Sequence, residues 1–224
     1  MKTVPTLLTT TSEEFISQMN IFQRYYDRIQ LDIADGNLVP NTTTQIEDIL
    51  EAVTENKVTI SPNSTFDFHL MVADYESELE KIVKIQQQNI RINTVLINAS
   101  REINIGKLNS TYTFSIGLDV FPDTTIEGLA HEYDLDCVPN VQIMTVNPGF
   151  QGSPFLPEML QKIEQLRVQG YSGEILIDGG VNSNTLQVIS SRSYKPDIIC
   201  IGSYLTKAGS DLDYRVSELK KFEQ

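Results

Sequence analysis

Apolar and polar positions along the chain follow two spacings. Short segments with every second residue apolar predict strands, and longer segments with apolar residues three or four positions apart predict helices. One strand shows the first spacing clearly, because Ile29, Leu31 and Ile33 are apolar and Gln30 and Asp32 lie between them. Gln30 and Asp32 therefore share one face, near the carboxyl end of a buried strand.

The two spacings alternate along the whole chain. Strands are expected over residues 3–8, 29–32, 66–72, 94–97, 115–120, 141–146, 174–178 and 197–201. Helices are expected over residues 12–25, 44–56, 75–88, 124–133, 156–168, 183–190 and 211–222. Residues 101–112 are polar and poorly periodic, so the helix there is expected to be short or missing. Strand–helix units without a linker predict one domain over residues 1–224, a (β/α)8 TIM barrel, with a doubly wound open sheet as the alternative.

Composition narrows the range of partners. The chain has 224 residues, of which 40% are hydrophobic and 21% charged, as in ordinary soluble globular proteins. Its formal net charge of −13 argues against nucleic acid and acidic membranes as partners. Cys137 and Cys200 form neither a metal-ligand spacing nor a disulfide framework, which suits a reducing cytoplasm. No signal peptide or membrane-spanning segment is expected.

Polar side chains gather where the expected strands end, and in a TIM barrel those ends form the functional face. Asp32, His69 and Asp178 are expected to converge on one mouth. Two carboxylates and an imidazole suit a divalent metal, whereas Asp32 alone would fit a turn cap and His69 alone an ordinary core histidine. The residues at these ends are Thr6, Gln30, Asp32, His69, Met71, Asn98, Asp119, Met144, Asn147, Asp178, Gly202 and Ser203.

Glycines add a second indication at the same face. Residues 147–152, 178–180 and 202–203 follow expected strands, precede expected helices and are rich in glycine. Each segment alone would fit an ordinary turn or helix cap. The last two lie after strands seven and eight, where many barrels bind phosphate through backbone amides. Together they favour a phosphorylated substrate, and amide binding agrees with the acidic composition.

Five segments resemble those of ribulose-phosphate 3-epimerases in order and spacing, and the resemblance covers essentially the whole chain. Allulose-phosphate epimerases share most of these motifs. The resemblance implies a ribulose-phosphate-binding type of (β/α)8 barrel, a pentulose 5-phosphate substrate and one divalent metal ion: zinc, iron, manganese or cobalt. The segments are residues 31–41, 67–72, 144–150, 177–181 and 201–203.

The resemblance also implies roles for individual residues. Asp32 and Asp178 would be the catalytic acid and base as well as metal ligands, and His69 would be a further ligand. Two carboxylates can invert a carbon next to a carbonyl, because one removes a proton and the other returns one to the opposite face. The implied substrate-binding residues are Thr6, His69, Met71, Met144, Gly149, Phe150, Gln151, Gly152, Asp178, Gly179, Gly180, Gly202 and Ser203.

Five positions depart from the family pattern. Gln30, Leu96 and Asn98 stand where the family has histidine, histidine and glutamate, Ala34 replaces a methionine, and Gln151 a glycine. Gln30 is expected to be the fourth metal ligand through its amide oxygen, which would weaken zinc relative to manganese or magnesium. Ala34 is expected to leave room for water over the reacting carbon.

The expected function is a metal-dependent epimerase that converts D-ribulose 5-phosphate to D-xylulose 5-phosphate through an ene-diolate, in the pentose phosphate pathway. One alternative is an epimerase for another ketose phosphate, such as allulose 6-phosphate. Another is a non-catalytic relative that binds a phosphosugar or a partner and has lost one metal ligand. The paired acids speak against the phosphate-binding barrels of tryptophan and thiamine biosynthesis. The protein is expected to be a cytoplasmic homo-oligomer.

Overall fold

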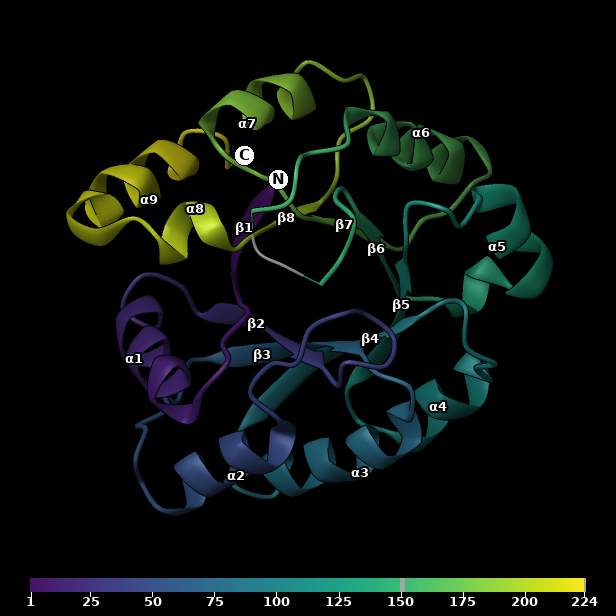
Figure 1. The fold of residues 1–224 in the computed structure, drawn as a ribbon. Helices are drawn as coiled ribbons and strands as arrows, with labels where there is room; N and C mark the ends of the chain where they lie inside the picture. The colour runs from purple at the N-terminus through teal and green to yellow at the C-terminus, as the bar shows by residue number, and fades with distance from the viewer. Residues whose placement is uncertain (150–151, 224) are drawn as a thin grey trace.

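The computed structural model describes residues 1–149 and 152–223, and its centre is a closed barrel of parallel strands (Figure 1). Each strand pairs with the next one in sequence, and β8 pairs with β1 to close the ring. The (β/α)8 prediction is confirmed, and the open sheet is excluded. The strands are β1 (Lys2–Leu7), β2 (Arg28–Ala34), β3 (Thr65–Met71), β4 (Arg91–Asn98), β5 (Ser115–Val120), β6 (Asn140–Met144), β7 (Glu174–Asp178) and β8 (Ile198–Ile201).

Helices surround the barrel as an outer ring (Figure 1). Among the described residues, no helix combines the length and apolar character needed to cross a bilayer. The α-helices are α1 (Ser12–Phe22), α2 (Ile46–Thr54), α3 (Tyr75–Gln86), α4 (Ile105–Thr111), α5 (Ile126–Glu132), α6 (Gln161–Val168), α7 (Ser183–Ser190), α8 (Ser203–Thr206) and α9 (Leu212–Lys220). The short 3-10 helices are η1 (Leu135–Cys137), η2 (Pro157–Leu160) and η3 (Gly209–Asp211).

Helix ends differ from the expected ones where a side chain binds the backbone or a neighbour. The helix expected from residue 44 begins at Ile46, because Gln45 has an extended backbone and its N donates to Asp48 Oδ2 at 3.1 Å as a cap. The helix expected over 156–168 is divided into η2 and α6. The doubtful segment 101–112 does contain a short helix, α4, whose first turn is capped by Asn104 through Lys107 N at 3.0 Å.

The apolar core has two zones. Most of it lies between the barrel and the helices, as amphipathic helices covering a parallel sheet require. A smaller zone fills the barrel interior, so the barrel is packed and is not a pore. The interior apolar side chains are Val4, Leu96, Leu176, Ile198 and Cys200.

Charged side chains close the amino-terminal end of the barrel. Arg28 Nε lies 2.6 Å from Asp67 Oδ2, and its guanidinium also reaches Glu174 at 3.2 Å. Asn93 Nδ2 donates to the other Asp67 oxygen at 2.8 Å. Both oxygens of this fully buried carboxylate therefore have donors, which is what a structural acid in a protein interior needs. The opposite end of the barrel is left for the site.

Candidate active site

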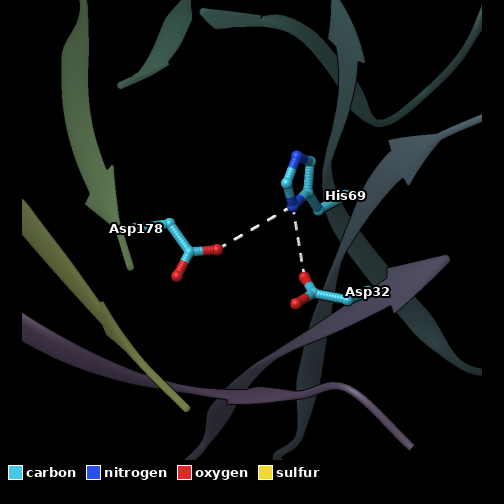
Figure 2. A group of neighbouring side chains, drawn as sticks. All are labelled: Asp32, His69 and Asp178. Carbon is cyan, nitrogen blue, oxygen red and sulfur yellow. Dashed lines mark hydrogen bonds and ion pairs between the residues drawn. The ribbon is translucent and has the colours of Figure 1, made fainter. Parts of the chain in front are cut away.

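Asp32, His69 and Asp178 meet at the carboxyl end of the barrel (Figure 2). Asp32 and His69 are register partners on β2 and β3, and Asp178 is the last residue of β7. His69 Nδ1 lies 3.2 Å from Asp32 Oδ1 and 3.8 Å from Asp178 Oδ2. All three side chains are buried. The sequence predicted this convergence, because the ends of parallel strands in a barrel share one mouth.

The charges of these residues are strongly coupled. Burial and the neighbouring Asp32 charge raise the pKa of Asp178 to about 8. Burial alone would lower the pKa of His69, but the carboxylates of Asp119 and Asp32 outweigh it and raise that pKa well above the usual value. Asp178 therefore holds a proton at neutral pH in the protein without a cation.

The donor set fits a divalent metal ion. Each of the three residues offers a ligand atom, and these atoms lie within 4.8 Å of one another. Carboxylate oxygen and imidazole nitrogen are ordinary ligands of transition-metal ions. Buried carboxylates held this close repel each other, and a cation between them would relieve that repulsion. Asp32, His69 and Asp178 would hold the ion.

Gln30 contacts both acids, with its amide in the orientation opposite to the expected one. Its Nε2 donates to Asp178 Oδ2 at 2.9 Å and to Asp32 Oδ1 at 3.2 Å. Its oxygen accepts a hydrogen bond from the Cys200 thiol at 3.3 Å. The reason is chemical, because a carboxyl oxygen that carries no proton only accepts hydrogen bonds, and the thiol supplies a donor for the amide oxygen. The amide nitrogen therefore links the two carboxylates.

A cavity opens above the acids, and most of the expected substrate-binding residues line it. Thr6, Met71 and Met144 form part of its wall together with Asp32 and Asp178. The hydroxyl of Thr6 is buried and has no hydrogen-bond partner among the described residues, so it is free to bind a ligand.

Ala34 lies deeper than expected and is closed off from solvent. It is completely buried in a cluster with Val39 and Met71, and the ring of Phe121 packs against that cluster. The room that Ala34 was expected to leave for water is therefore lined by apolar groups, which disfavour a bound water.

The glycine segments line the same cavity, as expected for a phosphate site. The lining includes Gly149, Gly152, Gly179, Gly180, Gly202 and Ser203, whereas Phe150 and Gln151 lie outside the described residues. Gly179 has a φ of 112°, and a Cβ there would approach Val146 Cγ2 to 2.4 Å. Only glycine suits this position, and its backbone is left open to a ligand.

One buried acid at the site was not assigned a role from the sequence. Asp119 on β5 is fully buried, and its Oδ2 lies 3.2 Å from His69 Nε2. Asn98, one of the departures from the family pattern, donates from Nδ2 to the same oxygen at 3.1 Å. Its neighbour Leu96 packs in the barrel interior and carries no polar group. Asp119 stood out as a polar strand-end residue, but spacing alone does not reveal its contact with His69.

Comparisons with known proteins show which sequences and folds this chain is similar to. A family model described as "Ribulose-phosphate 3 epimerase family" matches residues 2–206. The ribulose-phosphate 3-epimerase of Synechocystis sp. is 33% identical over 177 residues, which cover 74% of this chain and 70% of that protein. The Bacillus subtilis protein of the same name is 32% identical over 202 residues, covering 87% of this chain and 83% of the relative.

Solved structures with low sequence identity share the fold alone. A 3-hexulose-6-phosphate synthase superimposes with a TM-score of 0.66 at 15% identity, and 99% of each chain is covered. A tryptophan synthase complex from Pyrococcus furiosus gives a TM-score of 0.63 at 12% identity, with 98% of each chain covered. The match of the family model over most of the chain is far more specific than these likenesses, and with it the chain belongs to the ribulose-phosphate 3-epimerase family.

Proposed function

We propose that this protein inverts C3 of D-ribulose 5-phosphate to give D-xylulose 5-phosphate. The observation that carries the proposal is the convergence of Asp32 and Asp178 from β2 and β7 on one cavity that is also lined by glycines. A carbon next to a carbonyl is inverted when one group removes its proton and another returns a proton to the opposite face. Two carboxylates from different strands are suited to that pair of transfers.

The two acids reach the cavity from different strands, so they can take opposite roles in the proton transfers. In the forward direction Asp32 is the proposed base that removes the C3 proton, and Asp178 is the proposed acid that returns a proton to the opposite face. The reverse reaction exchanges these roles. The apolar side chains of Met71 and Met144 line the cavity and limit the access of water to the carbanion character that develops at C3.

A bound divalent ion would supply polarisation of the substrate carbonyl and stabilisation of the negative charge that develops on its oxygen. Asp32, His69 and Asp178 are the proposed ligands, and zinc, iron, manganese or cobalt suits them. Gln30 is the proposed fourth ligand, and this requires its amide to turn over from the orientation described above.

The phosphate is proposed to bind at the backbone amides of Gly179, Gly180, Gly202 and Ser203. These residues line the cavity, and no lysine or arginine is among its described lining residues. Amide donors are neutral, so they bind a phosphate without an ion pair. Gly149 and Gly152 line the same cavity, and with Phe150 and Gln151 they form the segment proposed to cover the sugar.

Exchange of the C3 proton with solvent tests the proposal. Wild-type protein loaded in turn with zinc, iron, manganese and cobalt should incorporate deuterium at C3 of ribulose 5-phosphate and form xylulose 5-phosphate. Asp32→Asn and Asp178→Asn should each lower the rate of conversion by about 10² to 10⁴-fold, because each removes one proton-transfer group. Asp136→Asn, at an exposed position away from the cavity, is the matched control.

A second function class is favoured by one observation, the link that Gln30 makes between the two carboxylates. An amide in this place can hold the acids together in a non-catalytic relative that binds a phosphosugar or a partner. Absence of C3 exchange with every metal, together with retained phosphate binding, would establish that class. Faster exchange with allulose 6-phosphate than with ribulose 5-phosphate would identify a different substrate for the same reaction.

The proposed assembly is a homo-oligomer in the cytoplasm that acts on a small sugar phosphate, with neither nucleic acid nor a membrane as partner. The net charge of −13 supports the two exclusions. Light scattering of the purified protein tests the oligomeric state, since a mass of 25.2 kDa would identify a monomer.

A further inference from the structure

His69 lies between two acids that contact opposite edges of its ring. Nδ1 is 3.2 Å from Asp32 Oδ1, and Nε2 is 3.2 Å from Asp119 Oδ2. Figure 2 shows that the second ring nitrogen points away from both Asp32 and Asp178. Asp119 is not among the described residues that line the cavity. Its contact with the Asp32–His69–Asp178 cluster is the one with the His69 ring.

Asp119 differs from the structural acid inside the same barrel. Asp67 is equally buried, but Arg28 and Asn93 provide donors to both of its oxygens. Asp119 has no arginine or lysine within ion-pair distance among the described residues, and its Oδ1 has no hydrogen-bond partner there. A fully buried carboxylate with so few hydrogen-bond and ion-pair partners destabilises the fold. This indicates that Asp119 has a role other than packing of the barrel.

A short chain of contacts orients this carboxylate. Ser100 donates from its backbone N at 3.0 Å and from its hydroxyl at 2.6 Å to Asn98 Oδ1. These donors fix which end of the Asn98 amide faces outward, so Nδ2 is left to donate to Asp119 Oδ2 at 3.1 Å. Asn98 and Asp119 are also register partners on β4 and β5. The oxygen next to His69 is therefore held in place.

We infer that Asp119 is a positioning residue that fixes the protonation and orientation of the His69 ring. Nε2 has no hydrogen-bond partner among the described residues although Asp119 Oδ2 is 3.2 Å away, so the contact acts mainly through charge. A carboxylate beside Nε2 favours a proton on that nitrogen, because a lone pair there would face a negative charge. Nδ1 then keeps its lone pair for an ion shared with Asp32 and Asp178. A carboxylate behind a ligating histidine also raises its basicity.

The inference rests on the proposed function, because it assumes that the three residues bind a metal. Its test reads the ring directly. The chain contains two histidines, and His131 is exposed, so the spectrum of a ¹⁵N-labelled sample contains two imidazoles. Long-range ¹H–¹⁵N correlation on the zinc-loaded protein should show His69 with a ligated Nδ1 and a protonated Nε2. His131→Gln assigns the signals.

Asp119→Asn then tests the carboxylate with little change in shape. Its zinc affinity, measured by competition with a chromophoric chelator, should fall by about 10 to 100-fold. Gln142→Met is the matched control, because Gln142 is a fully buried register partner of Asp119 and makes its side-chain contacts with Met144 and Cys200. This control should keep the wild-type affinity and the wild-type His69 spectrum.

Three results would overturn the inference: ligation through Nε2, no zinc binding by wild-type protein, or equal zinc affinities of Asp119→Asn and wild type. The wild-type spectrum decides the first two, so the inference stays testable if Asp119→Asn does not fold. Failure of the proposed function has a different signature. If the wild-type protein binds zinc through Nδ1 but does not exchange the C3 proton, the inferred role of Asp119 stands and the proposed epimerase activity is wrong.

Discussion

Gln30 Nε2 donates a hydrogen bond of 2.9 Å to Asp178 Oδ2, although the two residues are far apart in the sequence. The same nitrogen reaches Asp32 at 3.2 Å, so a neutral amide joins the two carboxylates on which the proposed chemistry depends. We therefore expect the side chain in this place to influence both the binding of a cation and the distance between the acids.

Replacing Gln30 with histidine should therefore raise zinc affinity. The substitution removes a hydrogen-bond donor from the carboxylates and offers a nitrogen ligand, which zinc prefers to an amide oxygen. We expect a gain of about tenfold or more in a chelator competition assay. Gln30→Leu is the control, because it removes the same donor and adds no ligand. Equal zinc affinities of the two variants would contradict the prediction.

The metal-free protein should lose stability as the pH rises. The pKa of Asp178 is raised from the ordinary aspartate value of 3.8 to about 8 in the fold, and that of His69 rises well above 6.5. The folded state therefore holds more protons than the unfolded state between these values, and the free energy of unfolding falls with increasing pH. Urea unfolding with a chelator present, from about pH 5 to about pH 8, measures the slope.

Asp178→Asn should flatten that slope between about pH 4 and about pH 8, because the variant lacks the titrating carboxyl. The remaining decrease should begin above pH 6.5, where the histidine of the unfolded chain loses its proton. Free energies of unfolding that increase with pH in the wild-type protein would show that the sign is wrong.

The acid at the amino-terminal end of the barrel should affect stability and leave metal binding alone. Asp67→Ala removes the partner of Arg28, with which Asp67 makes a 2.6 Å ion pair. Removing one member of a buried pair typically costs about 3–5 kcal/mol, and the lower end is expected here because Arg28 keeps its contact with Glu174. Urea unfolding should show a loss of that size with zinc affinity unchanged. Lys57→Met, which breaks exposed pairs with Glu51 and Glu55, should cost less than about 1 kcal/mol.

Gly179→Ala should abolish phosphate binding. The new Cβ would lie 2.4 Å from Val146 Cγ2, so the backbone at the cavity must move. Gly209→Ala is a matched control, because Gly209 also has a positive φ, of 54°, but open space around its Cβ. Inorganic phosphate titrated by calorimetry should bind to wild type and Gly209→Ala, whereas binding to Gly179→Ala should be lost. Equal phosphate affinities of the two variants would place the anion elsewhere.

The barrel and the Asp32–His69–Asp178 cluster could be predicted from the sequence because they depend on periodicity and on strand ends. Asp32 and His69 lie near the carboxyl ends of neighbouring strands, so their proximity follows from strand order alone. The orientation of Gln30 could not be predicted in this way. It depends on the Cys200 thiol, which comes from the other end of the chain and reaches Gln30 only after the ring closes.

The contact between Asp119 and His69 could not be predicted from the sequence for a similar reason. The two residues lie on strands that are separated by β4, so their separation depends on the tilt of the strands and on the size of the side chains between them. Alternation along β5 indicates which face Asp119 takes but not which neighbour it meets. The extent of burial, which makes its charge costly, likewise becomes known only from the closed barrel.

The order in which the three candidate ligands appear along the chain affects when the protein can take up an ion. Asp32 and His69 leave the ribosome early, on β2 and β3, whereas Asp178 arrives on β7. Pairing of β8 with β1 then closes the ring. Until Asp178 is made, the chain lacks one of the three residues of this cluster, so it should hold a cation more weakly than the folded protein. We therefore expect nascent chains to compete poorly with finished proteins for metal, and we expect loading to follow synthesis.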